Sequence, residues 1–154
     1  MANVIESRLA DMGIELPEPP PPVAAYVPYR IAVGLVHISG QLPLVDGELI
    51  VGKLGLDIDT EAGMAAARHC AINLLAQLRA ACGGDWERVG CAVKINGFVN
   101  STPEFKQHPQ VINGASEFLA SAMGEAGKHA RSAIGVSSLP LGAAVEVDGA
   151  FHIR

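Results

Sequence analysis

The chain has 154 residues, a net charge of −5 at pH 7 and 49% hydrophobic residues, which suits one globular domain whose core needs no metal or disulfide. Its acidic balance and its 5% aromatic content argue against nucleic-acid binding, which normally needs a basic face or a stacking platform. No apolar run is long enough for a membrane span, and the N-terminus lacks the pattern of a signal peptide. Three widely spaced cysteines fit reduced thiols and a cytoplasmic location.

The first 22 residues are expected to form an arm outside the main fold. Residues 4–12 predict a short helix that Gly13 would end. The segment from Leu16 to Pro22 contains five prolines and is typical of a stiff polyproline II strap. The folded domain is therefore predicted over residues 23–154.

Two predicted β segments open this domain. Residues 31–39 are rich in β-forming side chains interrupted by Gly34, which predicts a hairpin or a bent strand. Asp46-Gly47 is a turn signal, and it precedes a short predicted strand over residues 48–51.

A helix is predicted next, because apolar residues recur at helical spacing from Met64 to Cys82. Either Asp59 or Thr60 can cap its N-terminus, and the glycines at positions 83 and 84 can stop it.

The second half of the chain repeats the change from strand to helix. Residues 89–99 predict a long strand. Thr102-Pro103 is typical of a helix start, and Pro109 would restart or kink that helix before it ends at Gly124.

Two final strands over residues 132–136 and 144–153 complete the order β-β-β-α-β-α-β-β. This order predicts an α+β fold with a mixed sheet of about six strands and both helices on one face.

No phosphate-binding loop, dinucleotide fingerprint or nucleophile elbow is present, so any chemistry must rest on single residues at strand ends. Arg131 opens a predicted strand among small and apolar residues. Its guanidinium stays charged, so burial would require an anionic partner, and its fork matches a carboxylate with two parallel hydrogen bonds. The alternative, favoured by this residue alone, is a strand-end arginine that extends to solvent.

Glu146 is a second candidate. Strand alternation places it with Asp148 on one face, opposite Val145 and Val147. A carboxylate there can orient or activate water, although a solvent-facing pair is the commoner situation.

Tyr29 and Asn113 are weaker candidates, since a half-buried tyrosine and a polar residue on a helix face are ordinary structural features. The five histidines form no close pair with ligand spacing, so the sequence predicts no metal site. Histidines and cysteines alike are most simply structural.

Together these segments resemble the YjgF/RidA family. Residues 130–147 resemble its C-terminal signature, in which an arginine, a short strand, Leu-Pro and two small residues precede Val-Glu-Val or Val-Glu-Ile. The spacing of fifteen residues from Arg131 to Glu146 also matches. Val27-Pro28-Tyr29 and the Ile-Ser-Gly-Gln-Leu-Pro segment at 38–43 resemble the family's N-terminal blocks.

The resemblance covers residues 23–154, and it implies a chorismate-mutase-like fold and a homotrimer with a cleft at each subunit interface. By this resemblance Arg131 would bind a substrate carboxylate and Glu146 would position water. Tyr29 would line the cleft, Asn113 would be an auxiliary polar group, and the backbone around Gly40 would approach the ligand.

The activity implied by RidA-type members is hydrolysis of reactive enamine or imine acids, such as 2-aminoacrylate, to a 2-keto acid and ammonia. The imine is already electrophilic, so the protein need only orient a small carboxylate and place a water, with no metal or organic cofactor.

The chain also departs from the family pattern. Val27 stands where glycine often precedes Pro-Tyr, and Ala133 stands where some members have a cysteine, so thiol reactivity is not carried over. Residues 111–116 and 127–130 indicate a divergent branch.

Three other functions stay open at this point. A non-catalytic sensor of a small carboxylic acid would need Arg131 but not Glu146. A ribonuclease or translation inhibitor would follow the family's older name, against the acidic balance of this chain. A purely structural trimer would use Arg131 only to pair across the interface.

Overall fold

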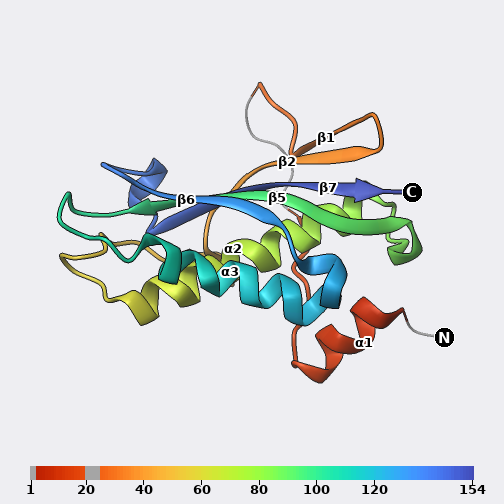
Figure 1. Cartoon of the computed structure of the whole chain (residues 1–154), viewed down its shortest axis with the longest axis horizontal. Helices are drawn as coiled ribbons and strands as arrows, with labels where there is room; N and C mark the ends of the chain where they lie inside the picture. The colour runs from red at the N-terminus through yellow and green to blue at the C-terminus, as the bar shows by residue number, and fades with distance from the viewer. Residues whose placement is uncertain (1–2, 20–24) are drawn as a thin grey trace.

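The computed structural model describes residues 3–19 and 25–154. Its main sheet has five strands in the order β1-β2-β7-β5-β6, and a separate two-stranded ribbon pairs β3 with β4 (Figure 1). β5 and β6 run parallel, whereas the other neighbours run antiparallel. The strands are β1 (Tyr29–Ala32), β2 (Leu35–Gln41), β3 (Leu44–Val45), β4 (Glu48–Leu49), β5 (Val89–Asn100), β6 (Ala130–Val136) and β7 (Val145–Ile153).

The main sheet is smaller than the expected six strands, because the segment after β2 leaves it. Pro43 follows β2 and has no N–H to extend the ladder. The strand predicted over residues 48–51 is the short β4, which pairs only with β3. Asp46 and Gly47 form the predicted turn between them, with φ values of 51° and 81° that suit a tight hairpin.

The prediction for residues 31–39 left open a hairpin or a bent strand, and the structure has the hairpin. Val33 and Gly34 connect β1 to β2 with φ values of 51° and 74°. Such left-handed values match the twist of a two-residue hairpin, although a β-branched residue rarely adopts them.

Two long helices, α2 (Thr60–Ala81) and α3 (His108–Met123), lie side by side on one face of the sheet, as predicted (Figure 1). Asp59 caps α2 by accepting a hydrogen bond from the Ala62 N–H at 2.8 Å. Among the described residues, no helix is long and apolar enough to cross a membrane.

The predicted start of the second helix at Thr102-Pro103 is wrong. Thr102 donates its N–H to the Leu54 carbonyl at 3.0 Å, and Phe105 donates back to the Thr102 carbonyl at 3.2 Å, so this segment forms a turn. The helix begins at His108, where Pro109 occupies the first turn and its missing N–H costs nothing. The predicted restart at Pro109 is the start of α3.

The helix predicted over residues 4–12 is α1 (Val4–Asp11). Asn3 is its N-cap residue and forms a capping box with Glu6. α1 packs against α3, and Ile5 and Leu9 join the main hydrophobic core. The predicted boundary between arm and domain, and most of the proline run, lie outside the described residues.

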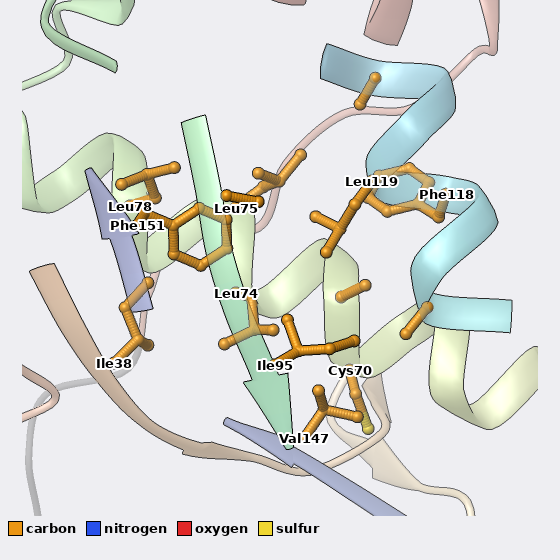
Figure 2. Packing of buried hydrophobic residues seen from close by; sticks show 14 of the residues in the cluster. Ile38, Cys70, Leu74, Leu75, Leu78, Ile95, Phe118, Leu119, Val147 and Phe151 are labelled. Atoms are coloured by element: carbon orange, nitrogen blue, oxygen red, sulfur yellow. The ribbon is translucent and has the colours of Figure 1, made fainter. Parts of the chain in front are cut away.

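The core fills the space between the helices and the sheet (Figure 2). α2 contributes small residues beside large ones, so it lies close to α3. At the crossing, a Cβ on Gly114 of α3 would overlap the backbone carbonyl oxygen of Met64 on α2. Fully buried side chains at the centre include Leu74, Leu75, Ile95, Val147 and Phe151.

Candidate functional site

Arg131 lies on β6, at one edge of the sheet, and points to the side that the helices cover. Its register partner Ile95 is fully buried on that side. Nη1 of Arg131 donates to Ser116 Oγ at 3.1 Å, and Nη2 donates to the Pro109 carbonyl oxygen at 3.1 Å. Both acceptors belong to α3, so this helix sets the direction of the fork.

The charge of Arg131 has no protein counter-ion in the part of the chain that the structure describes. There, the single salt bridge within 4.0 Å joins Lys128 to Glu125. A guanidinium held by neutral acceptors keeps its charge free to attract an anion.

A short relay of hydrogen bonds fixes Ser116, which anchors Arg131. His129 Nδ1 lies 2.6 Å from the Gly127 carbonyl oxygen, which can only accept, so Nδ1 carries the proton. In the neutral imidazole Nε2 then accepts from the Ser116 hydroxyl at 2.9 Å. The hydroxyl oxygen is left to accept from Arg131, so the relay has one consistent direction.

Asn113 lies on the same stripe of α3 as the two anchors of Arg131. Positions 109, 113 and 116 recur at four and three residues and therefore share one helix face. Asn113 is half-buried. The structure thus brings Asn113 to the neighbourhood of Arg131, as a group that could assist in holding a ligand.

Glu146 lies on β7 and points to the opposite face of the sheet. Val145 and Val147 on either side of it are fully buried against the helices, so alternation turns Glu146 to the open face. Burial raises the pKa of the Glu146 carboxyl, and the nearby Asp148 carboxylate raises it further. Asp148 itself accepts a hydrogen bond from Asn96 Nδ2 at 2.7 Å.

Gly40 lies directly beside Glu146. β2 has a register irregularity between Ile38 and Gln41 where it pairs with β7, and Gly40 falls within it. A Cβ at Gly40 would meet the Glu146 carboxyl group. The structure therefore brings Gly40 and Glu146 together.

Tyr29 begins β1, at the edge of the sheet opposite to β6. It pairs with Ile38, which is 3% exposed, and its half-buried ring packs against the core. Tyr29 therefore shares the helix-covered side with Arg131, but three strands lie between β1 and β6, and four strand spacings correspond to about 19 Å.

Within one chain the predicted site residues thus form two groups. Arg131 pairs with Ile95, and Glu146 pairs with Phe98, three residues further along β5. The Cα atoms of Arg131 and Glu146 are therefore about 14 Å apart, since they differ by three residues along the strands and by two strand spacings across the sheet. Their side chains lie on opposite faces. One chain alone does not bring Arg131 and Glu146 to a common ligand.

Ser116 and His129 orient Arg131 but were not predicted from the sequence as site residues. The one available signal was the position of His129, two residues before Arg131 and so on the same side of an extended chain. Ser116 carried no signal, because its role depends on how α3 packs beside β6.

Within the described ranges 3–19 and 25–154, no group of three or more histidine, cysteine, aspartate or glutamate side chains could hold a metal ion. All three cysteines are free thiols. Burial raises the pKa of the Cys70 thiol well above its usual range, and the Glu146 carboxylate adds to this, so Cys70 stays protonated and unreactive.

Comparisons with known proteins agree with this architecture. Residues 6–148 match the family described as "YjgF/chorismate mutase-like, putative endoribonuclease". Protein TCP17 of Trypanosoma cruzi is 46% identical over 152 residues, which cover 97% of this chain and 94% of that protein.

Two crystal structures are similar over nearly their whole length. Protein Atu1372 from Agrobacterium tumefaciens, of unknown function, is 45% identical with a TM-score of 0.91, covering 98% of this chain and 94% of that one. A putative endoribonuclease from Shewanella oneidensis MR-1 is 35% identical with a TM-score of 0.93, covering 97% and 99%. By sequence and by fold, the chain belongs to the YjgF/chorismate-mutase-like family.

Proposed function

We propose that this protein hydrolyses reactive enamine or imine acids, such as 2-aminoacrylate, to 2-keto acids and ammonia without a cofactor. The observation that carries the proposal is the Arg131 fork, which neutral acceptors on α3 hold in place while no carboxylate of the described residues pairs with it. A fixed and uncompensated guanidinium suits the carboxylate of a small substrate.

Glu146 supplies the second function that the reaction requires. The enamine first takes a proton on carbon to give the imine. Water then adds to the imine carbon, and the resulting carbinolamine expels ammonia and leaves the keto acid. A carboxylate whose pKa is raised by burial is a stronger base than an ordinary glutamate, so it can accept the proton of that water and return it to the leaving amine.

We infer that the working unit is a homotrimer with its sites between subunits. Arg131 and Asn113 lie on the helix-covered side near one edge of the sheet, whereas Glu146 and Gly40 lie on the open face. A neighbouring copy that covers the open face would bring the two groups together. The family resemblance supports this arrangement.

In the decisive assay, a dehydratase generates 2-aminoacrylate in situ, and the release of keto acid is followed. We expect Arg131→Ala to lower kcat/KM by about 100-fold, since a charge-assisted double hydrogen bond is lost. The exposed Arg79 on α2 offers a control, because Arg79→Ala removes the same charge away from the site. Equal rates for wild type and Arg131→Ala, after subtraction of hydrolysis in buffer, would exclude the deaminase.

A non-catalytic carboxylate sensor is the second candidate. It is favoured by the separation of Arg131 from Glu146 within one chain, because carboxylate binding needs Arg131 alone. Saturable binding of a small carboxylic acid that Arg131→Ala abolishes, with no acceleration of 2-aminoacrylate hydrolysis, would select this function.

Ribonuclease activity, which the family description suggests, has less support here. A net charge of −5 and an aromatic content of 5% give RNA neither a basic surface nor a stacking platform.

A further inference from the structure

A cavity of about 430 Å³ lies at the end of β6 that is remote from Arg131, and Lys53, Ser101, Phe105, His108 and Gly135 are among the residues that line it. We propose that this cavity binds the oxyanion group of a small organic molecule, with Lys53 as its cationic anchor. The proposal goes beyond the deaminase function and does not rest on it.

Lys53 is fixed in position by neutral acceptors. Its Nζ donates to Asn100 Oδ1 at 2.7 Å and to the Ser137 carbonyl oxygen at 2.6 Å. Asn100 is 5% exposed and is held in turn by its own donation to the Ala143 carbonyl oxygen at 3.1 Å. The ammonium group has three hydrogens, so one is left for a ligand.

No carboxylate of the described residues lies within 4.0 Å of the Lys53 ammonium. The neighbouring Asp57 carboxylate bonds the backbone N–H of Lys53 instead. A half-buried ammonium group that neutral groups fix at the wall of a cavity keeps its charge available to an anionic ligand.

Other hydrogen-bonding groups that line the cavity complement Lys53. Ser101, which is 7% exposed, places its Oγ 3.2 Å from His108 Nε2. His108 is also the first residue of α3, so the positive end of a 16-residue helix lies at the cavity. Lysine, hydroxyl, imidazole and helix end together favour an oxyanion.

Gly135 on β6 keeps this wall open. A Cβ there would lie 2.7 Å from Ser101 Oγ and would overlap the His108 ring. Phe105 packs edge-on against His108 with ring centroids 5.2 Å apart and gives the cavity an apolar side. The size falls in the usual range of small-molecule sites, about 300–1,000 Å³, so the ligand has an organic body as well as an oxyanion.

Arg131 is not among the residues that line this cavity, although its fork reaches the Pro109 carbonyl oxygen, one residue after His108. Gly135 is four residues beyond Arg131 on β6, which corresponds to about 13 Å along an extended strand. A single small substrate cannot have one carboxylate on both cations, so the two sites can be tested independently.

The test uses the full chain and three matched probes: phenyl phosphate, benzoate and the neutral benzamide. Titrations are followed by calorimetry and by backbone amide NMR shifts. We expect saturable binding of phenyl phosphate, benzoate or both, weaker binding of benzamide, and shifts centred on Lys53, Ser101 and His108. The two anions distinguish a phosphate site from a carboxylate site.

Lys53→Met should weaken anion binding by about tenfold or more, because a charged hydrogen-bond donor is lost. Lys128→Met is the matched control, since it removes the same charge from an exposed side chain before β6. If circular dichroism shows that Lys53→Met is unfolded, Ser101→Ala decides in its place and should weaken binding several-fold. Arg131→Ala should leave binding at this cavity intact, whatever its effect on deamination.

Three results would overturn the proposal. The first is no saturable binding of either anion by the wild type. The second is benzamide binding as tightly as the anions. The third is unchanged anion affinity in a folded Lys53→Met variant or, where that variant does not fold, in Ser101→Ala.

Discussion

The carboxyl group of Glu146 lies against the backbone of Gly40, so closely that a Cβ at position 40 would overlap its Oε1 atom. Only the flexible end of the glutamate stands in the way, so Gly40→Ala should fold with a loss of less than about 1 kcal/mol. The displaced carboxylate should nevertheless lower deaminase kcat/KM by between about 10-fold and about 100-fold. Thermal melts and the 2-aminoacrylate assay measure the two effects separately.

A double-mutant cycle checks the cause of that loss. If Gly40→Ala acts by moving Glu146, it should cost little further activity in a Glu146→Ala background. A loss of the same size in both backgrounds would mean that Gly40 acts on the ligand directly and not through Glu146.

Mixing two inactive variants tests whether the site is shared between subunits. Arg131→Ala and Glu146→Ala chains, unfolded together and refolded as a mixture, should regain activity, because some interfaces combine an intact Arg131 with an intact Glu146. Random assembly of equal amounts restores about a quarter of the sites in a ring. Each variant refolded alone is the control, and a mixture no more active than either would place both residues in one chain's own site.

The raised pKa of Glu146 also predicts a pH dependence of stability. The folded chain holds the Glu146 proton more tightly than the unfolded chain does, so this group's contribution to stability falls as pH rises from its ordinary pKa near 4.5 through the raised value. Glu146→Gln should therefore melt higher than wild type at pH 7, and the advantage should shrink as the pH falls and be lost below pH 4.5. The exposed Glu104→Gln serves as the control, and an advantage that does not change with pH would contradict the burial argument.

Gly114 is predicted to be essential for the close approach of α3 to α2. The Cβ of Gly114→Ala would overlap the Met64 carbonyl oxygen, and because that atom belongs to the α2 backbone the helices must separate. Overpacking of this kind costs about 1–3 kcal/mol, more than the gain of up to about 1 kcal/mol in helix propensity. Ser121→Ala on the exposed face of α3 should be neutral or stabilising in the same urea denaturation.

The sequence predicted the elements whose signals are local. The apolar spacing of α2, the Asp46-Gly47 turn and the strand alternation around Glu146 each depend on neighbours within one element. The Thr102-Pro103 signal was misleading because it is equally a turn signal, and the contact of Thr102 with Leu54 decides between the two.

Candidate residues for the site could be named from the sequence, but their arrangement in space could not. The side of the sheet that Arg131 faces follows from the parallel pairing of β6 with β5 and from the position of α3, which no local pattern encodes. The same holds for Lys53 and Ser137, which are 84 residues apart in sequence and meet only in the folded chain.

The docking of α1 on α3 bears on how this protein should be produced for study. A shortened protein that starts at Val23 would lack Ile5 and Leu9, two buried side chains of α1 that form part of the hydrophobic core. The side of α3 that α1 covers would then expose apolar side chains to water, and a shortened protein of this kind is prone to aggregate during expression. Clones meant for assays or crystals should therefore keep the chain from its first residue.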